Sequence, residues 1–253
     1  MINLKQALRT RTPTFGSWLC LGDATVAEIM ADAGFEWLVV DLEHSPMSIR
    51  EAADLVRVID LKGVVPLVRL TSNDADQAKR VLDAGARGII VPMVTAADEA
   101  RAAVEAVYYP PRGRRGVGLG RAHGFGPRFA EYLSWLADNA VVVVQIEHVR
   151  AIKALREIVA VDGVDGTIIG PYDLSASAGK PGAFNDPVIR ELLEEYRAVS
   201  METGKAMGIH AVEPDGAAAR SRLAEGYSFI ALGVDHMYLG SSCRRELTAL
   251  RVP

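Results

Sequence analysis

The chain lacks the features that mark several classes of protein. Its 253 residues include only two cysteines, Cys20 and Cys243, whose spacing fits neither a metal site nor a redox pair, so we expect two buried free thiols. No run of about 18 uninterrupted apolar residues predicts a membrane helix, and the N-terminal segment lacks the apolar core of a signal peptide. These absences favour a cytoplasmic protein without a membrane partner.

The sequence also lacks an excess of basic residues. Lysine and arginine number 28 against 32 aspartate and glutamate residues, which gives a formal charge of -4. A chain with this balance has no basic field to hold a nucleic acid backbone. We therefore expect a small-molecule partner and no nucleic acid.

Short β-branched runs alternate with longer alanine-rich stretches of helical period along the whole chain. Strands are predicted at Thr14–Cys20, Trp37–Asp41, Val64–Arg69, Gly88–Val91, Val141–Ile146, Gly166–Ile169, Lys205–Ile209 and Phe229–Val234. Helices are predicted at Asp23–Ala33, Ser48–Ile59, Asp74–Ala84, Ala96–Val107, His148–Val159, Pro187–Thr203, Pro214–Glu225 and from Met237 onward. The near-continuous hydrophobicity of the strands suits a parallel sheet covered on both faces. The pattern favours an α/β fold, a (β/α)8 TIM barrel that forms one domain over residues 1–253, rather than a doubly wound sheet.

Two glycine-rich segments bear on ligand binding. The run Gly116–Gly120 lies in a loop and opens no helix, so it does not predict a dinucleotide site. The surrounding irregular stretch, Tyr108–Arg128, is rich in glycine, proline and arginine. Loops of this length within compact domains are usually functional, and we expect this one at the rim of the active site.

Ionisable residues gather where four predicted strands end. The second strand runs into Asp41–His44, the third ends at Arg69, the fifth runs into Gln145–Glu147 and the sixth into Gly170–Asp173. Active sites of parallel barrels lie at the C-terminal ends of the strands. All four segments are therefore expected at one mouth.

Glu147 and Asp173 come from neighbouring strands, and their carboxylates suit a hard divalent cation, Mg²⁺ or Mn²⁺, with Co²⁺ or Zn²⁺ as further possibilities. A structural alternative is that each residue caps the helix or turn that follows it. His44 directly follows a strand and precedes Ser45-Pro46, so its imidazole is a candidate for proton transfer at the mouth, or else it bonds to the adjacent loop. Arg69 ends a buried strand and needs an anionic partner, which is either developing negative charge on a substrate or a structural ion pair with Asp41 or Glu43.

The remaining candidates concern substrate contacts. His210 ends the seventh strand and His123 lies in the long loop, and we expect both to influence substrate selectivity. Trp18, in the first strand, is also placed among the substrate-binding residues.

Several motifs in order resemble the HpcH/HpaI-type class II pyruvate aldolases, a family that includes 4-hydroxy-2-oxoheptanedioate and 2-keto-3-deoxyglucarate aldolases. The resemblance covers essentially the whole chain. It is carried by Gly34–Trp37, Val40–Pro46, Val68-Arg69, Leu82–Gly85, Val91–Val94, Tyr109–Gly113, Arg115–Gly118, Gln145–Glu147, Gly163–Gly166, Ile169–Ser175 and Gly233–Asp235.

The resemblance implies a role for each matching residue. Glu147 and Asp173 would bind the metal, Arg69 would steady an enolate oxygen, and His44 would act as acid and base through a metal-bound water. Asp83 resembles the aspartate that pairs with this histidine, and Gln145 a polar neighbour of the metal. The segment Gly170, Pro171, Tyr172 and Asp173 matches the one whose backbone N–H groups hold the pyruvate carboxylate. The family also implies homo-hexamers that exchange the last helix between subunits.

The expected activity is therefore metal-dependent and reversible cleavage of 4-hydroxy-2-oxo acids, through an enolate, into pyruvate or a related 2-oxo acid and an aldehyde. The alternative that keeps the same enolate site is an oxaloacetate decarboxylase or a citramalate- or malyl-thioester-type lyase. A barrel that binds 2-oxo acids without catalysis is a further alternative.

Overall fold

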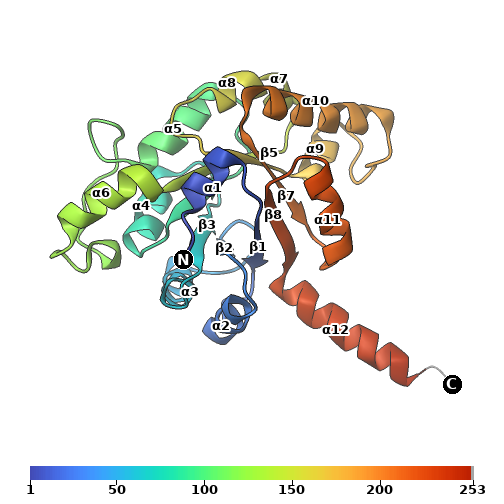
Figure 1. Cartoon of the computed structure of the whole chain (residues 1–253), viewed down its shortest axis with the longest axis horizontal. Coiled ribbons are helices and arrows are strands. Elements are labelled where there is room, and N and C mark those ends of the chain that lie inside the picture. Colours follow the sequence, from blue (N-terminus) through green and yellow to red (C-terminus); the bar gives the residue numbers. More distant parts are fainter. Residues whose placement is uncertain (252–253) are drawn as a thin grey trace.

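A computed structural model describes residues 1–251. Parallel strands β1 to β8 form a closed barrel in chain order, with β8 pairing back onto β1 (Figure 1). The strands are β1 Thr14–Leu19, β2 Trp37–Asp41, β3 Val65–Arg69, β4 Gly88–Val91, β5 Val141–Ile146, β6 Gly166–Ile169, β7 Ala206–Ala211 and β8 Phe229–Val234. The predicted TIM-type barrel is confirmed.

Helices surround the strands. They are α1 Leu4–Thr10, α2 Ala24–Asp32, α3 Ile49–Leu61, α4 Ala75–Asp83, α5 Ala97–Val107, α6 Phe129–Asn139, α7 Val149–Lys153, α8 Leu155–Val159, α9 Pro171–Ser177, α10 Pro187–Thr203, α11 Gly216–Ala224 and α12 Asp235–Leu250. Their apolar faces and the outward faces of the strands form one buried layer, and a second core fills the barrel interior. Trp37 and Phe229 stack in that interior with ring centroids 4.0 Å apart. Gly16 leaves the room that the Trp37 ring occupies.

All eight predicted strands are present, with ends that differ by at most two residues. The helix prediction was wrong in four places. The region His148–Val159 contains two short helices, because Ala154 between them has a non-helical backbone. Helices α1, α6 and α9 were not predicted.

The long segment Tyr108–Arg128 lies at the end of the barrel opposite to the one predicted. It follows the C-terminus of α5 and leads through the 3-10 turn Arg121–His123 and α6 to the start of β5. Arg121 contacts Asp60, near the end of α3, at 2.6 Å. Connections from a helix to the next strand lie at the N-terminal ends of the strands, so within one chain this loop is not at the active-site rim.

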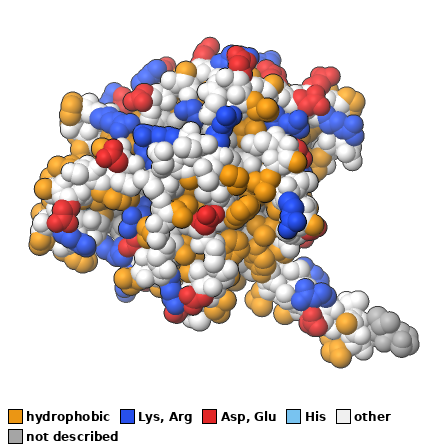
Figure 2. All heavy atoms as spheres, viewed as in Figure 1, with side chains coloured by type: hydrophobic (Ala, Val, Ile, Leu, Met, Phe, Trp, Pro, Cys, Tyr) orange, Lys and Arg blue, Asp and Glu red, His pale blue; other side chains and the backbone are white. Residues whose placement is uncertain are grey.

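Helix α12 extends away from the barrel, and in the part of the chain that is described its few contacts are mainly with β8 and β1 (Figure 1). Leu239 and Leu250 on it are 62% and 83% exposed. Hydrophobic side chains also gather near the point where α12 leaves the barrel (Figure 2). Cys243 lies on α12 and is exposed, so the expectation that both cysteines are buried was wrong for this one, and Cys20 is only partly buried. None of the helices described has the length and apolar character needed to cross a membrane.

Candidate active site

Arg69 lies at the C-terminal mouth of the barrel, between two acidic residues. Asp41 stands opposite it in the β2–β3 register and accepts hydrogen bonds from Nε at 2.9 Å and Nη2 at 2.6 Å. Nη1 lies 3.1 Å from Glu43 Oε2 in an ion pair. The guanidinium also stacks over the Trp18 ring, 4.4 Å from its centroid. The structural ion pairs considered for Arg69 are therefore present, and they fix its orientation.

Asp41 also organises the loop that carries His44. Its Oδ1 accepts the backbone N–H groups of Glu43 at 3.0 Å and His44 at 3.3 Å. Burial alone would raise the pKa of Asp41, but the hydrogen bonds and charge of Arg69 and these two N–H groups outweigh it and lower the pKa. The His44 side chain remains 64% exposed, with Nε2 3.9 Å from Glu43 Oε2. The imidazole is therefore open to a ligand in the mouth.

Glu147 is nearly inaccessible and is held at both carboxylate oxygens. Oε1 accepts the backbone N–H of Met93 at 2.6 Å, and Oε2 accepts Nε2 of Gln145 at 2.5 Å. Burial raises the pKa of Glu147, the Met93 hydrogen bond opposes this, and the charges of Glu43 and Asp173 raise it further. Glu147 does not cap the following helix, because His148 occupies the N-cap and accepts the Arg150 N–H.

Asp173 lies in the first turn of α9, after Gly170 at the N-cap and Pro171 at the first position. It is exposed and is not the capping residue. The Tyr172 side chain is 60% exposed and packs edge-to-face against Phe184. A side chain at position 170 would place Cβ 2.9 Å from Glu147 Oε2, so glycine keeps the space beside this carboxylate open.

Trp18 and His210 form another wall of the mouth. Their rings stack with centroids 5.2 Å apart, and His210 Nε2 lies 2.9 Å from the carbonyl oxygen of Gly233. A carbonyl oxygen only accepts, so Nε2 carries the proton and Nδ1 is a free acceptor. Burial lowers the pKa of His210 to about 4, which makes the ring neutral at physiological pH.

Two buried polar atoms at this mouth have neither a hydrogen-bond nor an ion-pair partner within residues 1–251: Trp18 Nε1 and Gln145 Oε1. Buried polar groups are normally paired, so unpaired ones need a ligand, an ion or water. The space beside Gly170, the carboxylates of Glu147 and Asp173, and the unpaired Gln145 Oε1 suit a hard divalent cation with oxygen ligands. The residues present fit such an ion.

Two predicted site residues lie elsewhere in the chain. Asp83 ends α4 at the opposite end of the barrel and contacts Arg115 at 2.6 Å, so within one chain it does not pair with His44. His123 is fully buried in the long loop and lies 2.8 Å from the Tyr109 hydroxyl. Within one chain His123 is therefore remote from the mouth, and its contact with substrate stays a prediction.

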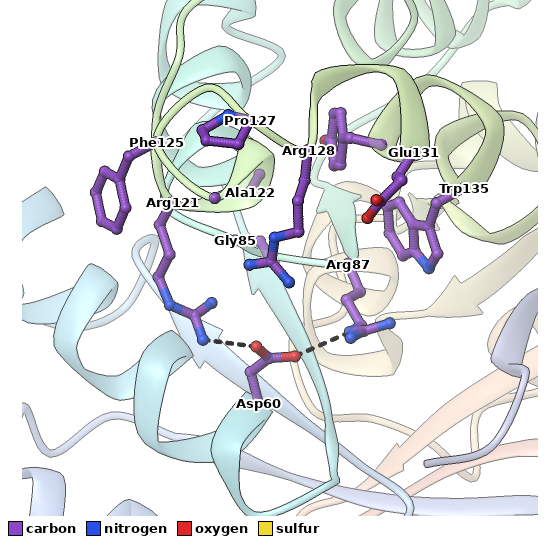
Figure 3. Close-up of a pocket in the computed structure, with 13 residues that line it drawn as sticks. Asp60, Gly85, Arg87, Arg121, Ala122, Phe125, Pro127, Arg128, Glu131 and Trp135 are labelled. Carbon is purple, nitrogen blue, oxygen red and sulfur yellow. Dashed lines mark hydrogen bonds and ion pairs between the residues drawn. The ribbon is translucent and has the colours of Figure 1, made fainter.

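A cavity of about 680 Å³ lies beside this loop, away from the mouth (Figure 3). Asp60 holds Arg87 at 3.0 Å and Arg121 at 2.6 Å on one side of it, and Trp135 lies on α6 (Figure 3). The cavity contains none of the groups from the strand ends. We therefore assign the chemistry to the mouth.

The sequence reasoning named Asp41 and Glu43 only as alternative partners of Arg69, although both are part of the site. It did not identify the backbone N–H of Met93 as a partner of Glu147. Met93 lies in the loop after β4, and its backbone has a positive φ of 53°. The motif Val91–Val94 is the only sequence signal that pointed to this loop.

Comparison with known proteins yields close relatives over nearly the full length. A family model described as HpcH/HpaI aldolase/citrate lyase matches residues 14–241. A hydroxypyruvate/pyruvate aldolase of Cupriavidus necator is 38% identical over 98% of this chain and 91% of the relative. A 4-hydroxy-2-oxo-heptane-1,7-dioate aldolase of Escherichia coli is 41% identical over 92% of this chain and 88% of the relative. The crystal structure of an HpcH/HpaI aldolase/citrate lyase family protein from Burkholderia cenocepacia has a TM-score of 0.93 and 35% identity over 100% of both chains.

Proposed function

We propose a specific reaction for this chain, which belongs to the HpcH/HpaI aldolase/citrate lyase family and is a carbon–carbon lyase. The proposed reaction is the reversible cleavage of 4-hydroxy-2-oxo acids into an aldehyde and pyruvate or a related 2-oxo acid. The two curated relatives are named for aldol reactions of this kind. The observation that carries the proposal is the position of Arg69, fixed by Asp41 beside the carboxyl groups of the mouth.

The charge of the mouth supports a metal requirement. Asp41, Glu43, Glu147 and Asp173 gather around Arg69, whose positive charge Asp41 and Glu43 already balance. An anionic 2-oxo acid would be repelled by the carboxylates that remain. A divalent cation held by Glu147 and Asp173, with Mg²⁺ or Mn²⁺ as our proposal, would offset this charge and polarise the keto oxygen of the substrate.

Arg69 supplies fixed hydrogen-bond donors. A guanidinium has five N–H donors, and Asp41 accepts two of them. Donors therefore remain for the substrate oxygen that becomes negative as the enolate forms. Because Asp41 holds the group in place, little reorganisation is needed when this charge develops.

We assign proton transfer to His44. In the cleavage direction the base removes the 4-hydroxyl proton, the C3–C4 bond breaks, and its electron pair moves into the enolate of the 2-oxo acid. The aldehyde leaves, and protonation at C3 gives the keto product. The exposed His44 ring can exchange its proton with solvent between these steps.

The carboxylate end of the substrate is placed against the first turn of α9, which offers the backbone N–H groups of Tyr172 and Asp173. Trp18 Nε1 is an unpaired donor, and Trp18 with His210 forms the wall that we propose shapes the aldehyde side.

Pyruvate release from 4-hydroxy-2-oxo acids, measured with and without a chelator, tests the proposal. We expect activity to fall to background on chelation, to return with Mg²⁺ or Mn²⁺, and to be absent in Glu147→Ala. Full activity after metal removal would overturn the metal-dependent aldolase. Release of CO₂ without an aldehyde product would instead indicate a decarboxylase.

Exposed leucines on α12 support a further proposal, assembly into a homo-oligomer in which neighbouring subunits cover this helix. A hexamer is the form that we propose from the family resemblance.

A further inference from the structure

Three different metal-binding side chains meet at the rim of the mouth, outside the Glu147 and Asp173 pair. Cys20 directly follows β1, and Asp235 and His236 begin α12 directly after β8. The sulfur, a carboxylate oxygen and an imidazole nitrogen all lie within 4.8 Å of one another. Within residues 1–251 no other three His, Cys, Asp or Glu side chains bring their ligand atoms this close together.

The spacing fits a tetrahedral site. His236 Nδ1 lies 3.4 Å from Asp235 Oδ1. Zinc bonds to nitrogen and oxygen of about 2.0–2.2 Å place two ligand atoms of a tetrahedron about 3.3–3.5 Å apart. One thiolate, one imidazole and one carboxylate form a mixed ligand set that suits a borderline-soft ion better than Mg²⁺.

Asp235 holds the cluster together before any ion binds. Its Oδ2 accepts the backbone N–H groups of Cys20 at 2.9 Å and Leu21 at 2.7 Å, and Oδ1 accepts the His236 N–H at 2.7 Å. These bonds tie the end of β8 to the end of β1, so little rearrangement is needed to bring the three side chains to one ion. The His236 side chain is 51% exposed, which gives an ion access from solvent.

The charges around the sulfur favour a cation. The Cys20 thiol donates to Asp41 Oδ2 at 3.4 Å. Asp41 and Asp235 place two carboxylates beside the sulfur. These carboxylates attract a divalent ion, which would replace the thiol proton.

We propose that Cys20, Asp235 and His236 form a binding site for a thiophilic divalent cation such as Zn²⁺, separate from the carboxylate site at Glu147 and Asp173. On binding, the metal–sulfur bond forms as the S–H bond breaks, and the proton goes to solvent. Asp41 then loses the Cys20 donor. Because Asp41 anchors Arg69, occupation of the rim site is expected to lower activity, a consequence that depends on the proposed aldolase function.

Cobalt binding to the full-length protein tests the site without reference to activity. A thiolate ligand to Co²⁺ gives a charge-transfer absorption in the near ultraviolet, whereas oxygen ligands at Glu147 and Asp173 do not. We expect this band in the unmodified protein and its loss in Cys20→Ser. His236→Ala should weaken the apparent Co²⁺ affinity by at least about tenfold, since even outer ligands of metal sites contribute that much.

Matched variants separate the outcomes. Cys243→Ser makes the same change at the exposed cysteine and should keep the band. Glu147→Ala should also keep it, and Zn²⁺ but not excess Mg²⁺ should displace the cobalt. A thermal melt of metal-free Cys20→Ser establishes that the variant is folded. No band in the unmodified protein, a band that survives in Cys20→Ser, or a band lost in Glu147→Ala would overturn the separate thiolate site.

Discussion

Asp41 and Arg69 face each other across neighbouring strands and are joined by two charge-assisted hydrogen bonds, 2.9 and 2.6 Å long. The pair is buried, and Asp41 also holds the backbone of the loop that carries His44. One carboxylate therefore positions both the proposed oxyanion donor and the proposed base.

Asp41→Asn should destabilise the protein and impair catalysis. Removing one partner of a buried ion pair typically costs about 3–5 kcal/mol, and because Glu43 still pairs with Arg69 we expect the lower end of that range. Urea unfolding measures the change. Asp54→Asn is the control, because Asp54 pairs with Arg57 on the exposed face of α3 and should cost less than about 1 kcal/mol. Equal effects of the two substitutions would contradict the anchoring role of Asp41.

Gly170→Ala should disturb Glu147 directly. The added Cβ would lie 2.9 Å from Glu147 Oε2 and 3.1 Å from Glu147 Cβ, and such overpacking typically costs about 1–3 kcal/mol. We expect a loss of pyruvate release together with weaker binding of the proposed divalent metal. Gly216→Ala meets open space at the start of α11 and should leave both quantities unchanged. Normal metal binding by Gly170→Ala would show that this glycine does not protect the carboxylate.

His210 should make stability depend on pH in a defined window. Its pKa is about 4 in the folded protein, whereas an unperturbed histidine titrates near 6.5. Between these values the unfolded chain binds the extra proton, so the contribution is fully present above about pH 6.5 and is lost as pH falls toward 4, with a slope of at most about 1.4 kcal/mol per pH unit.

The contribution of His210 can be measured by comparing the unmodified protein with His210→Gln. The quantity to follow is the difference between their free energies of unfolding from pH 4 to 7. Glutamine retains a donor for the Gly233 carbonyl but does not titrate in this range. The difference should grow as pH rises from 4 to 6.5 and level off above it. A difference independent of pH would show that His210 is not buried in the neutral form.

Subunit assembly is expected because Leu239, Leu247 and Leu250 on α12 are 62%, 48% and 83% exposed in the single chain. Sedimentation equilibrium should give the mass of several subunits. Charged substitutions at Leu239 and Leu247 should reduce that mass. The mass of a single subunit for the unmodified protein would contradict the oligomer.

The strands and the residues at the mouth could be predicted from the sequence for a physical reason. Buried parallel strands appear as short β-branched runs, and the residues that follow such a run must lie at the carboxyl end of the barrel. From this rule alone, Arg69, Glu147 and His210 could be predicted to lie at the C-terminal end of the barrel. The ion pair of Asp41 with Arg69 followed from the same strand ends, although the sequence could not say which partner Arg69 prefers.

The long loop was placed at the wrong end of the barrel because the sequence did not reveal a helix. Helix α6 begins at Phe129 after a glycine- and proline-rich loop and has no side-chain cap at Arg128, so the usual start signal is missing. Without α6, the preceding loop resembled a strand-to-helix connection at the mouth, and His123 was placed there with it. Asp83 was assigned through motif resemblance alone, and its position at the end of α4 is a property of the fold that a motif does not report.

Exchange of the methyl protons of pyruvate with deuterated solvent tests the central claim most directly, because it reports enolate formation without an aldehyde. Followed by proton NMR, the protein with Mg²⁺ or Mn²⁺ should exchange these protons well above the rate of metal ion alone, and Arg69→Ala should slow the exchange by about 10²–10³-fold while keeping its fold. Gly216→Ala, which meets open space at the start of α11, should exchange at the normal rate. Exchange no faster than with metal ion alone, or undiminished exchange by Arg69→Ala, would contradict enolate stabilisation at this mouth.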